Sequence, residues 1–461
     1  MIDKKIAKKV LNKLLASGGQ FGELFIQKRL SNSLRLDDNK IENALSGFEI
    51  GCGLRLIYED STYYAYLDSI EESKLFESAK ILRAAINSSI INKPINLNDS
   101  YSSYDVKVLK IPNEVDPEDK KNILIKVNEA ARNKSKYIYQ VTANLSDVQE
   151  ETIIANTDGI FSKNHVVKVF LAVSVIAIKN KEIRTGYKSL AKTKGFEIFN
   201  EKKPEVVAAE ATQIAINMLD AVNAPVGVLP VVIGPGFGGV IFHEACGHGL
   251  EADAIIKNAS VFKDKIGFKI ASDIVTALDD STLPGHWGSF KFDDEGTPSN
   301  KNVLIEDGVL RSYMLDIKSS KKLKSPLTGN GRRQSFRDIP IPRMTNTFIA
   351  NGSEEPENII NSVKKGIYAK EFSGGQVDPA TGDFVFGISE GYLIENGKLS
   401  NPIKGATLIG NGPEILNKIE AIGNDLDFSP GFCGKNGQSI TNEVGQPTIK
   451  ISSITIGGTG L

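Results

Sequence analysis

The sequence predicts an α+β fold with antiparallel strand pairing. The 461 residues are 41% hydrophobic and 24% charged, with 55 Lys and Arg against 56 Asp and Glu, which is the composition of a globular protein. Strand-like runs follow one another at hairpin spacing, and single helices separate the groups. Only nine of the 42 glycines precede residue 223. This change in glycine content predicts an N-terminal α+β domain at 1–222 and a β-rich domain at 223–461.

The first half alternates helices with groups of antiparallel strands. An amphipathic helix opens the chain, with Asp3 as its cap and with Gly18 and Gly19 ending it. Further helices are expected at 71–86, 117–133 and 204–221, and strands at 23–28, 33–37, 48–58, 63–67, 137–144, 148–156 and 166–179. Asp116 and Pro117 suit the cap and the first position of the middle helix.

The second half is expected to be mostly antiparallel β with one helix that carries the metal. A buried strand at 226–234 precedes a helix that begins near Gly239, and short strands with turn sequences at 306–308, 395–397 and 411–413 follow. The segment GPGFGG before the helix matches a dinucleotide-binding pattern. Residues 251–265 do not form the parallel strand with an acidic end that such a site requires, so we do not favour nucleotide binding.

Charge and cysteine content restrict the partners and the compartment. The net charge of −1 provides no basic field for phosphates, so direct nucleic-acid binding is not expected. The three cysteines, Cys52, Cys246 and Cys433, lie too far apart for a disulfide framework. The longest apolar run, 170–178, is too short to cross a membrane, and the N-terminus lacks signal-peptide features. We expect a cytoplasmic protein without a membrane segment.

The segment IFHEACGHGLEAD contains an H-E-x-x-x-H motif, in a chain with only four histidines. In the familiar metallopeptidase motif the two histidines are four residues apart and share one helix face. Here His243 and His248 are five apart, which separates them by about 140° on a regular helix. They can bind one ion only if the helix widens into a π-type turn or ends at 245–249, where glycines tolerate distortion.

A third metal ligand must come from elsewhere, because catalytic zinc usually has three protein ligands and one open position. Cys433, in PGFCGKNGQ, ranks first because thiolate is a preferred zinc ligand and glycines permit close approach. His286 ranks second and Cys246 third. In the alternative interpretation His243 is a hydrogen-bonded interior residue, His248 caps a helix and Cys433 is a small buried hydrophobe.

The blocks HEACGHGLEAD, DDEGTPS, GRRQSFRDIPIPRMTNTFI, GGQVDPATGDFVFGISEGYLIENGK, PIKGATLIGNG and GFCGKNGQ together resemble the TldD/PmbA family. The resemblance covers nearly the whole chain, and the H-E-x-x-x-H motif marks the TldD type rather than the PmbA (TldE) type. It implies a zinc-dependent peptidase of small or unfolded polypeptides. The implied ligands are His243, His248 and Cys433, with Glu244 as the catalytic acid/base. A heterodimer with the metal-free sister subunit, or a homodimer, is also implied.

Zinc bound by two neutral imidazoles and one thiolate has a net charge near +1, which activates water while Glu244 transfers the proton. The β-rich half could bind an extended peptide through backbone pairing. Charged side chains could line that groove, or could instead be solvated loop residues and surface ion pairs: Asp293, Asp294, Glu295, Arg332, Arg333, Arg337 and Arg343. The alternative function is a non-catalytic peptide-binding scaffold with a structural metal, which a fourth protein ligand would indicate.

Overall fold

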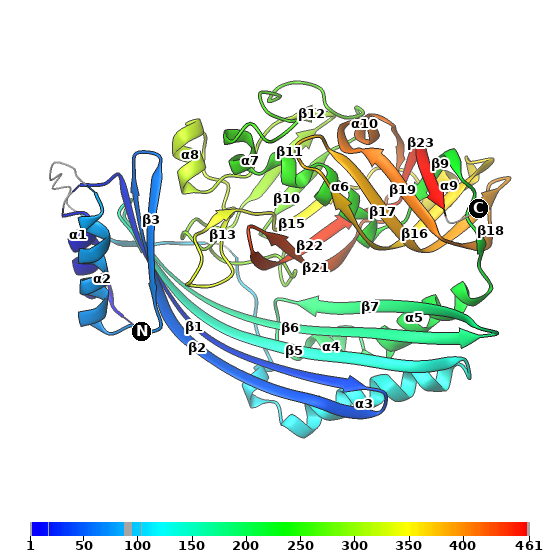
Figure 1. The fold of residues 1–461 in the computed structure, drawn as a ribbon, viewed down its shortest axis with the longest axis horizontal. Helices are drawn as coiled ribbons and strands as arrows, with labels where there is room; N and C mark the ends of the chain where they lie inside the picture. The colour runs from blue at the N-terminus through cyan, green and yellow to red at the C-terminus, as the bar shows by residue number, and fades with distance from the viewer. Residues whose placement is uncertain (1, 17, 87–94, 103, 459–461) are drawn as a thin grey trace.

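A computed structural model describes residues 2–16, 18–86, 95–102 and 104–458. A long, curved sheet from the first half of the chain lies beneath a lobe formed by the second half (Figure 1). The predicted α+β class is confirmed, while the domain boundary at residue 222 stays a prediction. Among the described residues, every helix is too short or too polar to span a bilayer.

The first half, here the N-terminal lobe, builds a seven-stranded sheet with helices at both ends. Its helices are α1 (Lys4–Leu14), α2 (Glu72–Ala84), α3 (Pro117–Lys134), α4 (Ile198–Glu201) and α5 (Pro204–Asn217), and its strands are β1 (Phe21–Asp37), β2 (Lys40–Tyr58), β3 (Ser61–Leu67), β4 (Asn98–Asp99), β5 (Ile138–Asn156), β6 (Ile160–Lys179) and β7 (Glu182–Lys192). The order is β3-β2-β1-β5-β6-β4, and β7 also pairs with β6. Apart from the short parallel β4–β6 pair, neighbouring strands are antiparallel.

Several strands are longer than predicted. The segments 23–28 and 33–37 belong to one strand, β1, and 137–144 and 148–156 to another, β5. Polar residues that looked like breaks pair across the ladder: Asn32 Nδ2 donates to Asp147 Oδ1 at 2.8 Å. Lys120 Nζ, on the helix α3 that covers the sheet, lies 2.6 Å from Asp147 Oδ2. Cross-strand hydrogen bonds therefore satisfy side chains that an alternation pattern treats as interruptions.

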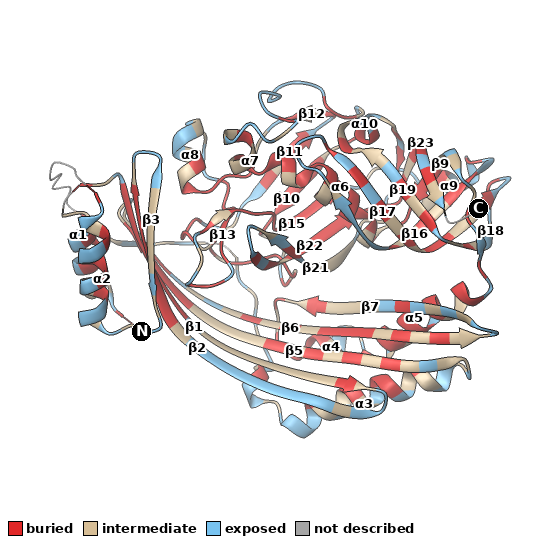
Figure 2. Cartoon of the chain, in the orientation of Figure 1, coloured by how far each residue is buried: buried red, intermediate tan, exposed pale blue. Residues whose placement is uncertain are grey.

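Two cores anchor the long sheet. Side chains of α1 and α2 pack on β1–β3 at one end, and those of α3 and α5 pack on β5 and β6 at the other. Asp3 caps α1 as predicted, accepting a hydrogen bond from the amide of Ile6 at 2.9 Å. Figure 2 shows buried residues where helices or the upper lobe cover the sheet, while the outer part of β2 is exposed.

The second half, here the C-terminal lobe, contains two larger sheets and short helices. Its helices are α6 (Val240–Ala245), α7 (Ala252–Ile256), α8 (Ile317–Leu323), α9 (Pro356–Asn361) and α10 (Gly412–Asn417), and its strands are β8 (Val222–Asn223), β9 (Gly227–Ile233), β10 (Ala277–Asp280), β11 (Lys301–Glu306), β12 (Val309–Leu310), β13 (Gly331–Arg332), β14 (Ile341–Pro342), β15 (Asn346–Ile349), β16 (Lys365–Val377), β17 (Asp383–Glu395), β18 (Lys398–Lys404), β19 (Ala406–Asn411), β20 (Ile419–Ile422), β21 (Asp427–Lys435), β22 (Gln438–Gln446) and β23 (Ile449–Gly458). One sheet has the order β12-β11-β10-β15-β22-β21, and the other contains β9, β16, β17, β19 and β23. Most pairs are antiparallel, but β9–β16, β15–β22 and β8–β18 are parallel.

The helix α6 lies between the two sheets and contacts strands of both. The preceding glycines serve this packing: a Cβ on Gly239 would lie 2.6 Å from the carbonyl oxygen of Gly445, and one on Gly238 2.5 Å from Gln446 Nε2. The next strand, β10, belongs to a different sheet from β9. The GPGFGG segment therefore does not lie in the βαβ unit of a dinucleotide-binding site.

Buried ion pairs join the two lobes. Arg55 Nη2 lies 2.6 Å from Glu23 Oε2, within the long sheet, and 2.6 Å from Glu295 Oε1 in the other lobe. Arg333 crosses the interface in the opposite direction to pair with Glu23. All four side chains are at most 1% exposed. The solvated-loop interpretation is therefore wrong for Glu295 and Arg333.

Candidate metal centre

The helix that carries the H-E-x-x-x-H motif ends inside the motif. After Ala245, Cys246 leaves helical geometry at φ −129° and ψ −48°, and one 3-10 turn follows at Gly247–Leu250. The helix end expected at 245–249 is confirmed. As a result, His248 returns beside His243, with ring centroids 5.1 Å apart and ring planes at 82°.

The glycines of the motif permit close packing. A Cβ on Gly247 would lie 2.3 Å from Met344 Sδ, and one on Gly249 would lie 2.9 Å from the Phe262 ring. Both glycines have negative φ angles. Space for neighbouring side chains, rather than a left-handed backbone, is therefore the reason that these positions suit glycine.

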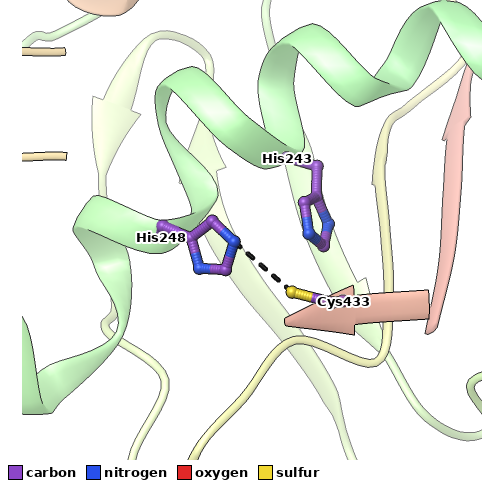
Figure 3. Close-up of side chains that lie close together, drawn as sticks. All are labelled: His243, His248 and Cys433. Carbon is purple, nitrogen blue, oxygen red and sulfur yellow. Dashed lines mark hydrogen bonds between the residues drawn. The ribbon is translucent and has the colours of Figure 1, made fainter. Parts of the chain in front are cut away.

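Cys433 reaches the histidine pair from the hairpin of β21 and β22 (Figure 3). Asn436 and Gly437 form its turn with φ angles of 51° and 76°, and this register pairs Cys433 with Ile440. Cys433 Sγ lies 3.4 Å from His248 Nε2, and the donor atoms of His243, His248 and Cys433 all lie within 4.8 Å of one another. The structure thus brings together the three residues that ranked first in the sequence.

The other two candidate ligands lie apart from this cluster. Cys246 is 1% exposed within the hydrophobic core, where burial raises the pKa of its thiol. His286 Nδ1 lies 2.6 Å from Glu443 Oε2, and its ring packs on Phe428 with centroids 4.7 Å apart. The local packing of each residue accounts for its position without a metal.

Glu251 orients His248. It is fully buried, and its Oε2 lies 2.9 Å from His248 Nδ1 and 2.9 Å from Lys435 Nζ. The other carboxylate oxygen accepts a hydrogen bond from the amide of Met344 at 3.3 Å. Burial opposes ionisation of Glu251, but Lys435 and His248 outweigh it and lower its pKa to about 2. A carboxylate on Nδ1 directs Nε2 of His248 toward Cys433, as in metal-ligating histidines.

Asn442 is the neighbour of the other histidine. Its Nδ2 lies 3.3 Å from His243 Nδ1 and 3.5 Å from Nε2, while its buried Oδ1 has no hydrogen-bond partner among the described residues. A 180° rotation of the amide exchanges these atoms, and Oδ1 then accepts a hydrogen bond from Nδ1–H. Neither Asn442 nor Glu251 was predicted from the sequence. The spacing of Glu251, three residues after His248, was the available signal for the latter.

The cluster favours a thiolate. Burial alone would raise the pKa of Cys433, but His243 and His248 lower it to about 4. Burial would likewise lower the pKa of His248, but Glu251 and Cys433 raise it well above its usual value. A thiolate is the form of cysteine that binds metals.

The donor set fits zinc. A zinc–nitrogen bond is about 2.0–2.1 Å long and a zinc–sulfur bond about 2.3 Å. In a tetrahedral site the nitrogen and sulfur atoms are therefore about 3.5 Å apart. The 3.4 Å between His248 Nε2 and Cys433 Sγ agrees with this value. Two imidazoles and one thiolate also disfavour hard cations such as Mg²⁺ and Ca²⁺.

Glu244 lies beside the cluster on α6. Its Oε2 is 3.6 Å from His248 Nε2, and its side chain is 31% exposed. A carboxylate that is partly open to solvent next to His248 Nε2 can exchange a proton with water or with a substrate there.

The remaining charged candidates have separate environments. Asp293 and Arg332 are buried, and with Asp294 they line a cavity between the lobes. Arg343 is fully buried and donates to the backbone carbonyl of Cys433. The solvated-loop interpretation is wrong for these buried residues. It fits Arg337, which is 38% exposed and pairs with two surface carboxylates.

Known proteins of one family match this chain over nearly its whole length. Family models for the PmbA/TldA metallopeptidase match as domain 1 at 22–89, as the central domain at 110–219 and as the C-terminal domain at 226–458. The Metalloprotease TldD homolog of Haemophilus influenzae is 39% identical over 448 residues, covering 95% of this chain and 93% of that protein. The homolog of Buchnera aphidicola is 38% identical over 451 residues, with the same coverages.

More distant relatives extend the comparison. The Zinc metalloprotease TldD homolog of Saccharolobus solfataricus is 28% identical, covering 98% of this chain and 99% of that protein. Two crystal structures share the fold: a putative modulator of a DNA gyrase from Thermotoga maritima (TM-score 0.82, 20% identity, 98% and 100% coverage) and TldE from Thermococcus kodakarensis (TM-score 0.80, 21% identity, 98% and 99% coverage). The identity and coverage of these matches show that the chain belongs to the TldD/PmbA family of metallopeptidases.

Proposed function

We propose that this metallopeptidase binds zinc through His243, His248 and Cys433 and hydrolyses peptide bonds of small or unfolded polypeptides, with Glu244 as general acid/base. The observation that carries the proposal is the convergence of two imidazole nitrogens and one thiol sulfur within 4.8 Å, beside a partly exposed carboxylate. The name of the Saccharolobus solfataricus relative supports zinc as the metal.

Bound zinc would act as a Lewis acid that polarises the scissile carbonyl and activates water. The chain supplies the rest of the chemistry. Glu244 accepts the proton of the attacking water and donates it to the leaving amine. Glu251 holds Nδ1 of His248, so that its Nε2 would be free for the ion, and Asn442 orients the His243 ring.

A scaffold with a structural metal remains the alternative. A structural zinc site is closed by four protein ligands, whereas a catalytic site keeps one position for water. Over residues 2–16, 18–86, 95–102 and 104–458, the metal-binding group at this site has three members. Three ligands support the catalytic proposal.

Substitution of Glu244 tests the function. The variant Glu244→Gln keeps the shape of the side chain but cannot accept a proton, so we expect kcat for an unfolded peptide to fall by about 10²–10⁴-fold. Zinc content by elemental analysis should stay stoichiometric. Glu414→Gln, an exposed glutamate paired with Lys418, is the matched control and should keep full activity. Full activity of Glu244→Gln would exclude the assigned role.

Substrate binding and assembly are part of the same proposal. The strands of the β-rich lobe would bind an extended peptide through backbone hydrogen bonds, which suits unfolded substrates of varied sequence. We propose a dimer, either with a TldE-type sister subunit or with a second copy. The fold shared with a TldE structure supports the first form. The three cysteines are free, which supports a cytoplasmic location. Co-purification from the native cell identifies the partner.

A further inference from the structure

A cavity of about 620 Å³ lies between the two lobes and is lined by residues of both. Its lower wall comes from β1, β5 and β6, and its upper wall from residues 287–294, Arg332 and the β21–β22 hairpin. Side chains alternate along β21, so Phe432 lines this cavity while Cys433 points to the histidine pair. The cavity therefore lies on the opposite face of the hairpin from the metal centre. Its volume is that of a ligand-binding pocket.

Two cations at the cavity have no carboxylate partner among the residues that the structure describes. Lys168 Nζ and Arg332 Nη2 both donate to Thr441 Oγ1, the second at 3.4 Å, and Arg332 Nη1 donates to the carbonyl of Met344 at 2.9 Å. Arg332 is only 6% exposed. Within the described part of the chain, no Asp or Glu oxygen forms an ion pair with either side chain at 4.0 Å or less. The adjacent Arg333, by contrast, pairs with Glu23.

The nearby carboxylates are engaged elsewhere. Glu150 Oε2 accepts a hydrogen bond from Gln27 at 2.8 Å, and Asp294 Oδ2 accepts one from the amide of Arg333 at 2.8 Å. Burial and the charge of Arg332 lower the pKa of Lys168 to about 7, although Glu150 and Asp294 oppose this. A buried cation and a half-buried one, here Arg332 and Lys168, favour an anionic ligand when they have no direct counter-ion.

An aromatic wall adjoins the cations. Lys168 Nζ lies 5.3 Å from the ring centroid of Trp287, and Arg332 Cζ lies 5.3 Å from that of Phe290. Phe432 stays 58% exposed although its ring packs against Trp287 at 5.9 Å. This combination of charge and exposed apolar surface matches a ligand that carries a carboxylate on an apolar body.

We propose that this cavity binds a peptide carboxylate through Lys168 and Arg332 and holds the adjoining apolar side chains against Trp287, Phe290 and Phe432. The carboxylate belongs to a peptide C-terminus or to an acidic side chain. The cavity would anchor a polypeptide behind the hairpin that carries Cys433. The inference rests on the proposed function in taking peptides as substrates, but binding at the cavity requires neither the metal nor cleavage.

Trp287 is the single tryptophan of the chain, so its fluorescence reports on the cavity directly. The full-length Glu244→Gln variant is titrated with an apolar hexapeptide with a free C-terminus, the same peptide amidated, and an amidated version with one internal Glu. We expect a saturable change with the free acid and binding at least about tenfold weaker with the plain amide. Binding of the Glu-containing amide would identify a side-chain carboxylate as a second source.

Three variants sharpen the test. Lys168→Met should weaken binding of the free acid about tenfold, and Lys168→Arg should restore it because the charge remains. Lys163→Met is the matched control, since Lys163 lies on the same strand, is exposed and does not line this cavity. Circular dichroism checks the fold of each variant.

Three results would overturn the proposal. The first is equal binding of the free acid and the amide when the cavity residues are unchanged, and the second is unchanged binding of the free acid in a folded Lys168→Met variant. The third is a fluorescence response to inorganic phosphate alone. None of them bears on whether Glu244→Gln abolishes cleavage. Failure of the cavity proposal and failure of the proposed function are therefore distinguishable.

Discussion

Two buried polar clusters in this protein solve the same electrostatic problem differently. Between the lobes, Glu23, Arg55, Glu295 and Arg333 neutralise one another through direct ion pairs. At the metal centre, three donor atoms instead converge on a common point. Burial of charge is costly unless it is compensated. The first cluster is compensated by the chain itself and joins the lobes, whereas we propose that a bound cation completes the second.

The largest effect expected at either cluster is the loss of zinc affinity when Cys433 is removed. Cys433→Ala removes the sulfur ligand, and we expect zinc affinity to fall by more than the roughly 10–100-fold that loss of a hydrogen-bond partner of a ligand causes. Elemental analysis after dialysis should find substoichiometric zinc. Cys246→Ala, which removes a buried thiol outside the cluster, should retain zinc. If Cys433→Ala still bound stoichiometric zinc, Cys433 would be excluded as a zinc ligand.

Loss of one partner in the lobe-joining cluster should instead reduce stability. Arg333→Met leaves Glu23 with one cation instead of two, and an incompletely paired buried charge costs about 3–5 kcal/mol. Urea unfolding measures this change, and zinc content should not alter. Arg337→Met at the surface is the control, with an expected cost below about 1 kcal/mol. A similar small cost in both variants would show that the buried cluster does not hold the lobes together.

The same cluster predicts a pH dependence of stability. Burial raises the pKa of Glu295 to about 7, with Asp316 and Glu23 adding to the effect and Arg55 opposing it. The folded state therefore binds this proton more tightly than the unfolded state, where the pKa is about 4.5. The free energy of unfolding should fall by at most about 3 kcal/mol as the pH rises from about 4.5 to about 7.

Glu295→Gln should flatten that slope, because the amide does not titrate. Urea unfolding at intervals across the pH range measures it, with Glu49→Gln at the surface as the control. An unchanged slope in Glu295→Gln would assign the pH dependence to other groups, of which Asp293, with its pKa also raised by burial and by Glu295, is the first candidate.

The two clusters also differ in how far the sequence predicted them. The motif spacing of His243 and His248 required a π-type turn or a helix end, and thiolate chemistry ranked Cys433 first, so local rules identified the candidate metal centre. The lobe-joining cluster depends on contacts between residues that are far apart in the chain, such as Arg55 and Glu295. Charge pattern alone left Glu295 and Arg333 either in a substrate groove or in a solvated loop, because it contains no information on which loop faces which sheet.

In the fold, too, local features were predicted from the sequence and features that depend on distant contacts were not. Helices with caps, such as the one after Asp3, were predicted within a few residues because capping is local. The polar strand β7 (Glu182–Lys192) was missed, since its pattern carries little apolar alternation and its pairing with β6 supplies the order. The parallel pairing of β15 with β22, which helps position the hairpin, likewise joins segments about a hundred residues apart.

The smallest expected change in zinc affinity follows substitution of Glu251. This residue shares features of both clusters, because it is an ion-paired carboxylate that also orients a proposed metal ligand. Glu251→Gln keeps the size of the side chain but removes the charge that faces His248 and Lys435, so zinc affinity should fall about 10–100-fold. Chelator competition measures the affinity, and the absorption spectrum of the Co²⁺-substituted protein reports the ligand geometry. Glu251→Asp should recover part of the loss, because the carboxylate is retained. If Glu251→Gln lost stability but kept both zinc affinity and the Co²⁺ spectrum, Glu251 would belong with the structural ion pairs.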